Sequence, residues 1–322
     1  YGDHRDLHLS LRRQRQMCIR DRISNAGNIT RLFVAPEWKQ FIIGNNKDHT
    51  FIHGETFDVD NDGDADFIGA RYQPGLIVWF EQPNKNSTST LWKARIAEDV
   101  IIGVHGVLKA DVNNDGKLDL LANSAQPKGR FPDSAVWLEV PTNPLTADRW
   151  TRHVFAKKDA PGLSHYLGAG DLNGDGLLDI TLAAKGGPQD KSGKGEWFGW
   201  WEATKDSTKP FKKHLLPGKH PGATNIMPAD VNGDGKLDII AGRGHGVGLI
   251  WFENPNWNIH DINTDLMSPH CLQVGDIDAD GDIDAVTCAY VSRKAAWFEN
   301  DGKGSFTTHT VSYTHLTLPT KA

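Results

Sequence analysis

The sequence has few cysteines and lacks the long apolar segments of a membrane protein. Three cysteines in 322 residues exclude a small fold held together by disulfides. No apolar run approaches the roughly 18 residues of a membrane-spanning helix, so we expect no membrane span. No stretch sustains the 3.6-residue apolar period of an amphipathic helix.

Three common motifs of catalysis and nucleotide binding are also missing. The sequence contains no Gly-x-Ser-x-Gly motif, no phosphate-binding glycine loop and no His-Glu-x-x-His motif. Instead it is rich in glycine (33 residues) and in acidic residues (41). With 38% hydrophobic and 24% charged residues, the composition is typical of a folded globular protein.

The two ends of the chain are related through the genetic code. Arg12–Asp21 and Val311–Thr320 can be encoded by the two strands of one DNA segment, because ten consecutive codons match when one peptide is read backwards. This pattern is typical of a sequencing adaptor. We therefore expect residues 1–22 and 311–322 to be adaptor-derived, and the protein proper to span about 23–310 and to be truncated at both ends. Without these ends, which carry six Arg, one Lys and three Asp, the net charge changes from −6 to −10, a charge that does not favour nucleic acid as a partner.

One nine-residue pattern, Asp-x-Asp/Asn-x-Asp-Gly-x-x-Asp, occurs five times. Consecutive copies are 46 to 60 residues apart, and they begin at Asp58, Asp111, Asp171, Asp230 and Asp276. A repeat of this length indicates propeller blades or arrays. An apolar strand, a Trp-centred strand and a closing strand follow each copy. With the strand before the copy they make four, the number in a propeller blade.

We therefore predict an all-β fold, a β-propeller of four-stranded antiparallel blades. Residues 31–44 are predicted to form the last two strands of one further, incomplete blade. Since closed propellers have several blades, we expect part of a ring of six to eight. The five complete blades are predicted near residues 45–100, 101–160, 161–218, 219–264 and 265–310.

The Asp-rich loops and the Trp strands, such as Leu249–Glu253, carry a resemblance to known families. Over about residues 31–310 the units resemble the FG-GAP and VCBS repeats of integrin-type and bacterial secreted propellers. This resemblance implies a calcium-binding, ligand-binding module that is extracellular, at the cell surface or periplasmic. The Trp-Phe-Glu-Asn strands and recurrent histidines also resemble, more weakly, the propellers of carbohydrate lyases and of aldos-2-ulose dehydratases, which implies an enzyme.

Each loop presents the alternating oxygen side chains that Ca²⁺ prefers, and Mg²⁺ fits less well because it demands a stricter octahedral geometry. Positions 1, 3, 5 and 9 offer side-chain oxygens, position 7 a backbone carbonyl, and Gly at position 6 permits a sharp turn. In the loops of the family that the chain resembles, the ninth residue closes the site. We expect about five structural Ca²⁺ ions, bound most tightly in the first and last loops, although ordinary Asp/Gly hairpin turns are the alternative. The candidate ligands are Asp58, Asp60, Asp62, Asp64 and Asp66; Asp111, Asn113, Asp115, Lys117 and Asp119; Asp171, Asn173, Asp175, Leu177 and Asp179; Asp230, Asn232, Asp234, Lys236 and Asp238; and Asp276, Asp278, Asp280, Asp282 and Asp284.

A second polar set is predicted at the opposite end of the propeller, where the first strands begin and where loops join the second and third strands. His105, His165 and His270 share one repeat position, six residues before a loop, and His53 is one residue out of this register. The other residues predicted on this rim are Arg71, Tyr72, Tyr166, Arg243, His245, Tyr290 and Arg293.

Three interpretations of this rim stay open. It can bind a carbohydrate or a protein, with Arg71, Tyr72, Arg243, His245 and Arg293 as the ligand-binding candidates. It can be catalytic, with a Tyr or His moving the proton of a β-elimination; the candidates are His105, His165, His270, Tyr166 and Tyr290. A histidine copied with each repeat can also simply cap a strand.

The remaining recurrent residues are predicted to be structural. His153, His214, His260 and His309 fall in the outermost strands, and the strand-three tryptophans are expected in the core between blades. Cys271 and Cys288 are predicted to lie nearly opposite each other in one hairpin. They can form a disulfide or can be two small buried thiols.

Overall fold

The computed structural model describes residues 21–24, 29–45, 51–83, 88 and 90–312. These residues form 23 strands and no helix, and hence no helix able to cross a membrane. The strands make one three-stranded sheet and five four-stranded sheets, and all their pairings are antiparallel. The prediction of an all-β fold built from four-stranded antiparallel blades is confirmed.

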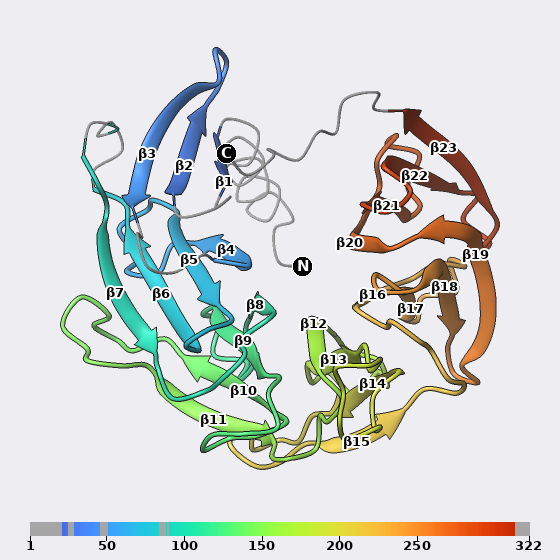
Figure 1. The fold of residues 1–322 in the computed structure, drawn as a ribbon, viewed down its shortest axis with the longest axis horizontal. Helices are drawn as coiled ribbons and strands as arrows, with labels where there is room; N and C mark the ends of the chain where they lie inside the picture. Colours follow the sequence, from blue (N-terminus) through green and yellow to red (C-terminus); the bar gives the residue numbers. More distant parts are fainter. Residues whose placement is uncertain (1–20, 25–28, 46–50, 84–87, 89, 313–322) are drawn as a thin grey trace, which may run out of the picture.

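The five four-stranded sheets, blades 1 to 5 in chain order, share one plan, in which strands adjacent in sequence pair. Figure 1 shows the sheets arranged around a common centre, with the first strand of each blade innermost and the fourth outermost. Blade 1 consists of β4 (His53–Phe57), β5 (Asp66–Arg71), β6 (Leu76–Glu81) and β7 (Lys93–Glu98). Blade 2 consists of β8 (Val107–Ala110), β9 (Asp119–Ser124), β10 (Ser134–Glu139) and β11 (Thr151–Ala156).

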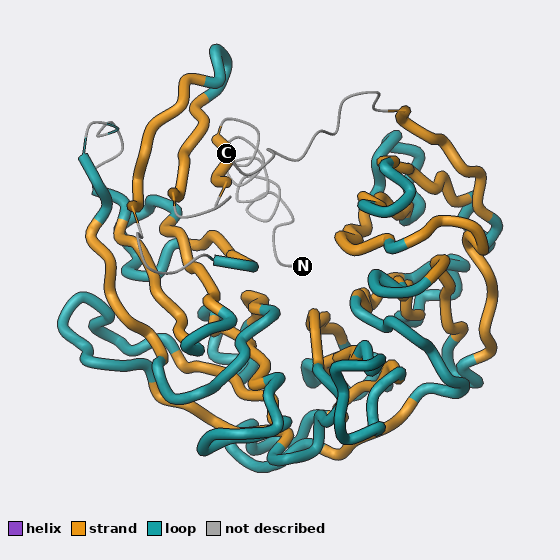
Figure 2. The backbone as a smooth tube through the Cα atoms, in the orientation of Figure 1, coloured by secondary structure: helices purple, strands orange, loops and turns teal. Residues whose placement is uncertain are grey.

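The other three blades repeat this order of strands. Blade 3 consists of β12 (Ser164–Gly170), β13 (Asp179–Ala184), β14 (Trp197–Glu202) and β15 (Lys212–Leu215). Blade 4 consists of β16 (Asn225–Ala229), β17 (Asp238–Gly242), β18 (Val247–Glu253) and β19 (Asn258–Met267). Blade 5 consists of β20 (Pro269–Gly275), β21 (Asp284–Ala289), β22 (Lys294–Asn300) and β23 (Phe306–Ser312). Only Ser268 separates β19 from β20, and Figure 2 shows this connection as nearly continuous strand.

The three-stranded sheet contains β1 (Asp21–Ser24), β2 (Ile29–Val34) and β3 (Lys39–Asn45). The sequence predicted only the last two of these strands, because β1 is a four-residue strand without a clear apolar alternation. β1 pairs with Arg31–Val34 of β2, so the sheet begins inside the segment predicted to be adaptor-derived. The remainder of that segment, residues 1–20, and residues 313–322 at the other end lie outside the described residues.

The hydrophobic core lies between neighbouring sheets. One cluster joins Trp137 of blade 2 to Leu182 and Trp201 of blade 3, and another joins Trp251 of blade 4 to Phe298 of blade 5. The strand-three indoles of blades 1 to 4 are buried as predicted, as in Trp79, Trp137 and Trp201 at no more than 1% exposed, whereas Trp297 of blade 5 is only partly buried. Burying each large apolar side chain stabilises the fold by about 1.5–3 kcal/mol.

The outermost histidines have one repeated structural role. The ring of His153 stacks on Trp137 with 4.1 Å between centroids, and its Nε2 lies 2.9 Å from a carboxylate oxygen of Glu139. Each partner is in the adjacent third strand of the same blade, so the contact holds the outer strand against the blade. The prediction that these histidines are structural is confirmed. The equivalent groups are His214, Trp200 and Glu202; His260, Trp251 and Glu253; and His309, Trp297 and Glu299.

Candidate functional site

All five Asp-rich loops connect the first strand of a blade to its second. Because every blade has the same strand order, the loops gather at one end of the sheets, as predicted. They lie between β4 and β5, β8 and β9, β12 and β13, β16 and β17, and β20 and β21.

Hydrogen bonds within each loop bend the backbone around the acidic side chains. In blade 3, Asp171 accepts the N–H groups of Asp175 at 3.1 Å and Gly176 at 2.8 Å, and Asn173 accepts the N–H of Asp175 at 3.0 Å. Gly176 has a φ of 83°, a left-handed conformation that glycine adopts without Cβ strain. The bend draws oxygen ligands together: one atom from each of Asp58, Asp60 and Asp62, and likewise from Asp276, Asp278 and Asp284, lies within 4.8 Å of the others.

The ninth residue of each loop has an anchoring role that the sequence pattern did not reveal. Asp238 is fully buried, and its two carboxylate oxygens accept the N–H of Val231 in the loop at 3.1 Å and the N–H of Asn254 after the third strand at 2.8 Å. Each oxygen keeps a further lone pair, so the residue can still be a cation ligand. The same pair of bonds occurs at Asp66, Asp119, Asp179 and Asp284.

The electrostatics of the loops fit a cation. Burial raises the pKa of Asp66 and of Asp119 to about 7, and that of Asp179 to about 6. Burial and the neighbouring Asp280 and Asp284 carboxylates raise the pKa of Asp282 to about 6. Oδ1 of Asp282 is buried, and no hydrogen-bond partner among the described residues reaches it. A divalent cation in the loop would offset both burial and repulsion, because it favours the ionised carboxylates.

At the other end of the sheets the structure brings together five of the predicted rim residues, His105, His165, Tyr166, His245 and His270, which we call the axial cluster. The ring centroids of His105 and His165 are 3.8 Å apart. Nε2 of His245 lies 3.1 Å from Nε2 of His165 and 3.2 Å from Nε2 of His270. The Tyr166 hydroxyl is 3.4 Å from Nδ1 of His270. The cluster therefore combines side chains from four blades.

Two more predicted residues lie at the edge of the axial cluster. The Tyr72 ring meets His105 edge-on at 6.0 Å, and its hydroxyl accepts a hydrogen bond from the Gln126 side-chain amide. The Tyr290 ring is 6.4 Å from that of His270. Both tyrosines can therefore contact a ligand that enters the cluster from its rim.

Two of the three predicted arginines contact groups outside the axial cluster, and the third lies in an exposed turn. The guanidinium of Arg71 is buried and lies 4.6 Å over the ring of Phe51. Arg243 donates to the carbonyl of Val247, and its other terminal nitrogen is 3.3 Å from Nδ1 of His220. Arg293 is exposed in the turn between β21 and β22. Anion recognition at the cluster therefore depends on other groups.

Burial makes the axial histidines poor proton acceptors. It lowers the pKa of His105 to about 3 and that of His245 to about 4, and it also lowers the pKa of His165 and His270. The ammonium group of Lys185 lowers the pKa of His245 and His270 further. The imidazoles are therefore neutral at neutral pH, the form that accepts hydrogen bonds and binds metals.

A family comparison agrees with the repeat structure. The profile of the FG-GAP-like repeat matches residues 58–122, 171–241 and 230–287, together more than half of the chain, and each match begins at the first Asp of a loop. The chain belongs to the FG-GAP-like repeat family. No curated protein matches the chain.

Two further residues position the axial cluster in this FG-GAP chain: His53, which the sequence placed near the rim, and Asn123, which the sequence pattern missed. His53, one residue out of register, lies with its ring 5.0 Å from that of Tyr166 and accepts the N–H of Val107 at 3.2 Å. The fully buried Asn123 accepts the N–H of His105 at 2.9 Å and donates to the carbonyl of His165 at 2.8 Å. A single amide side chain among the apolar residues of β9 was the only signal for this contact.

A cavity of about 330 Å³ adjoins the axial cluster. Leu163 lines the cavity, and its carbonyl accepts the Nδ1–H of His165 in the axial cluster at 3.0 Å. Phenol, amide, hydroxyl and carboxylate groups line the cavity and offer both donors and acceptors. The lining residues are Tyr72, Gln126, Pro127, Asp133, Gly162, Leu163, Gln189, Asp190, Lys191 and Ser192.

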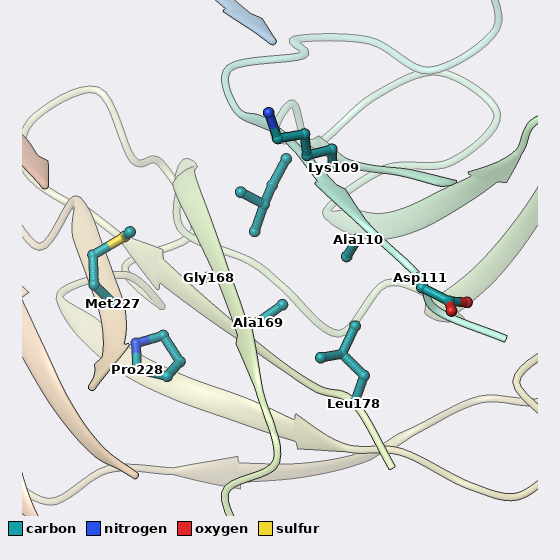
Figure 3. Close-up of a pocket in the computed structure, with 9 residues that line it drawn as sticks. Lys109, Ala110, Asp111, Gly168, Ala169, Leu178, Met227 and Pro228 are labelled. Atoms are coloured by element: carbon teal, nitrogen blue, oxygen red, sulfur yellow. The ribbon is translucent and has the colours of Figure 1, made fainter. Parts of the chain in front are cut away.

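A second cavity, of about 360 Å³, lies between the inner strands of blades 2, 3 and 4, toward the Asp-rich loops. Figure 3 shows Ala110, Ala169 and Leu178 around this space, with Met227 and Pro228 on the facing strand. Its mainly apolar lining offers few groups to orient a polar ligand, so we assign it no role.

Cys271 and Cys288 are directly opposite each other in β20 and β21, as predicted. Both thiols are free in the structure and both residues are exposed, so the prediction that they are buried is wrong. They are exposed because they lie on the face of blade 5 that no other described sheet covers. Whether they form a disulfide under oxidising conditions stays a prediction.

Proposed function

We propose that this FG-GAP chain is a calcium-stabilised propeller module that binds carbohydrate at the end carrying the axial cluster. The observation that supports it most directly is that the histidines of three blades converge beside a 330 Å³ cavity lined by polar side chains. A concave site with a few convergent polar groups is the usual form of a ligand pocket.

Calcium would stabilise the opposite end. In blade 3 it would be held by Asp171, Asn173 and Asp175, by the backbone carbonyl of Leu177 and by Asp179, with equivalent residues in the other blades. Bound Ca²⁺ would tie the first strand to the second. Its positive charge would also offset the negative charge of the buried ninth carboxylate. Modules of this type bind Ca²⁺ at about 10⁻⁴–10⁻³ M, so we infer an extracellular, cell-surface or periplasmic location.

The ligand class follows from the cavity lining. A sugar hydroxyl both donates and accepts, and the Gln126 amide, the Tyr72 hydroxyl and the Asp133 carboxylate together match that dual character. Lys185 beside the cluster would favour a carbohydrate that carries a carboxylate there, with its neutral hydroxyl groups against the Asp133 and Asp190 carboxylates of the cavity. A uronate-containing oligosaccharide is therefore the ligand that we favour.

Calorimetric titration of the Ca²⁺-loaded protein with oligogalacturonate and, separately, with a neutral maltooligosaccharide tests the proposal. We expect binding of the uronate, weakened at least tenfold in Gln126→Ala, where one amide–hydroxyl contact is lost. The matched control is His214→Ala on the outer strand, which should bind as the wild type does. Absence of binding to both sugars, or equal binding by Gln126→Ala, would contradict the carbohydrate proposal.

A second candidate function is catalysis of β-elimination on such a carbohydrate. It is favoured by the 3.4 Å contact between the Tyr166 hydroxyl and Nδ1 of His270; burial raises the pKa of Tyr166, so the protonated phenol could give a proton to the leaving oxygen. Incubation with polygalacturonate should then give an unsaturated product that absorbs in the ultraviolet, and Tyr166→Phe should abolish it without loss of binding. If the protein binds the polymer but forms no product, the catalytic function is excluded and only the binding function remains.

A further inference from the structure

Three imidazole nitrogens of the axial cluster converge on one point. His165 comes from the start of β12, His245 from the turn between β17 and β18, and His270 from the start of β20. Their nitrogens lie within 4.8 Å of one another, and the two closest contacts are 3.1 and 3.2 Å. Around a tetrahedral ion with metal–nitrogen bonds of about 2.0–2.1 Å, neighbouring ligand nitrogens are about 3.3 Å apart. The two closest separations are near that value, and the third lies within 4.8 Å.

The hydrogen bonds around the rings leave Nε2 atoms with free lone pairs at the point where the three histidines converge. Nδ1 of His165 donates to the Leu163 carbonyl at 3.0 Å, so in the neutral ring Nε2 is unprotonated. Nδ1 of His270 faces the Tyr166 hydroxyl, whose oxygen can accept a hydrogen bond from Nδ1–H, which leaves Nε2 unprotonated as well. In the absence of a metal, the Nε2–H of His245 is then the single donor, and the Nε2 atoms of His165 and His270 are its two acceptors. This proton moves to Nδ1 of His245 when that residue binds a metal, whereas His165 and His270 already have the arrangement of metal-binding histidines, with the distal N–H given to a carbonyl or another acceptor.

Buried groups of adjacent segments fix the backbone of each histidine. Asn123 donates to the carbonyl of His165 at 2.8 Å, and Asn225 donates to the carbonyl of His270 at 2.9 Å. The N–H of His245 donates to the carbonyl of Gly222 at 3.1 Å. A Cβ on Gly222 would lie 2.3 Å from the carbonyl carbon of His245, so glycine permits this close approach. The three rings are therefore held in place by the fold itself.

The donor atoms select the class of ion. A set of three imidazole nitrogens suits Zn²⁺ and its transition-metal neighbours, whereas Ca²⁺ and Mg²⁺ require oxygen ligands. His245 is exposed, so a fourth position on the ion would be open to water or to a ligand. The nearby Lys185 ammonium favours an anionic group at that position.

We propose that His165, His245 and His270 form a three-histidine site for a transition-metal ion, with Zn²⁺ as the preferred occupant. This site is distinct in position and chemistry from the proposed calcium loops, and it does not depend on the proposed carbohydrate ligand. It would place a Lewis-acidic ion next to the 330 Å³ cavity.

The test is a titration of the metal-stripped protein, refilled with excess Ca²⁺ to occupy the oxygen loops, with Zn²⁺ by calorimetry and with Co²⁺ by absorption. We expect a single tight Zn²⁺ site and the intense visible bands of tetrahedral Co²⁺. His245→Ala changes an exposed turn and should preserve the fold, checked by its melting temperature in Ca²⁺. It should weaken Zn²⁺ binding by about 100-fold or more, because loss of a direct ligand costs at least as much as loss of an outer partner.

The matched control is His214→Ala, which removes a histidine from the outer strand and should leave the Zn²⁺ titration and the Co²⁺ spectrum unchanged. The proposal is overturned if the wild type shows no Zn²⁺ binding in excess Ca²⁺, or if folded His245→Ala binds Zn²⁺ as tightly as the wild type. The second result would assign the binding to other residues. Neither result depends on whether the sugar binds.

Discussion

The buried carboxylate of Asp179 accepts the backbone N–H of Ala203 at 2.8 Å, because the start of the second strand of blade 3 lies beside the end of its antiparallel third strand. Its other oxygen accepts the N–H of Leu172 at 3.0 Å. Each blade repeats this bridge, so an Asp that a motif marks as a metal ligand also ties the loop to the third strand.

Replacing Asp179 by Ala should therefore destabilise the protein even without calcium. Two buried N–H groups would lose their acceptor, at a cost of about 1–3 kcal/mol each. Denaturant unfolding in a chelator should show this loss. The control is Asp175→Ala, an exposed residue of the same loop, which should matter only when Ca²⁺ is present. Equal stability of Asp179→Ala and wild type in chelator would contradict the bridging role.

Calcium should raise the melting temperature. If each loop binds with a dissociation constant of about 10⁻⁴–10⁻³ M, then about 10 mM Ca²⁺ adds about 1.4–2.7 kcal/mol per filled site to the free energy of unfolding. Calorimetric melting with and without a chelator measures the shift. An Asp58→Asn, Asp62→Asn variant should show a smaller shift than the wild type, and an unchanged melting temperature after chelation of the wild type would rule out the proposed role.

The rings of His214 and Trp200 stack with 4.2 Å between their centroids and 13° between their planes. This contact should contribute to the stability of the fold and not to ligand binding. We expect His214→Ala to lower the free energy of unfolding by about 1 kcal/mol, because it loses the stacking and the bond to Glu202. His214→Phe keeps the stacking and should recover part of the loss. Denaturant unfolding of both variants checks this, and equal losses would show that stacking contributes little.

Acid should destabilise the fold through His53. Burial lowers the pKa of His53 to about 4, below the value of about 6.5 for an unfolded chain, so the unfolded state takes up the proton first. The stability that neutral His53 contributes is complete above about pH 6.5 and falls, by about 3 kcal/mol, as the pH drops to about 4. The titratable groups that face His53 are His105 and Tyr166, and the pKa of His105 is lowered in the same direction.

Unfolding measured across this pH range, at one calcium concentration, should show a shallower decline for His53→Gln than for the wild type. The Gln side chain can still accept the N–H of Val107, so the comparison isolates the protonation of the ring. Parallel pH profiles for the two proteins would show that His53 does not carry the effect.

The repeat gave most of the blade architecture in advance. Each loop from Asp58 to Asp284 preceded an apolar strand and then a Trp strand, and that order is local, so the sequence alone predicts it. The sequence did not predict strand β1, because four residues are too few to show an apolar alternation. The exposure of Cys288 was also missed, since burial depends on a neighbouring sheet and not on the residue itself.

The polar rim was predictable in part. The shared position of His105, His165 and His270 placed them at one end of the propeller, but Arg71 and Arg243 share that end without joining the cluster. Long side chains can turn toward the core or a carbonyl, and no pattern in the chain fixes their direction.

By itself, the sequence determined the blades, the end that carries the acidic loops and the strands that hold the tryptophans, because these follow from short-range periodicity. Only the tertiary structure decided which histidines meet, that the ninth Asp bridges two backbone N–H groups, and that a polar cavity adjoins the axial cluster. These features join residues more than 100 positions apart, and their distances depend on how whole blades pack against one another.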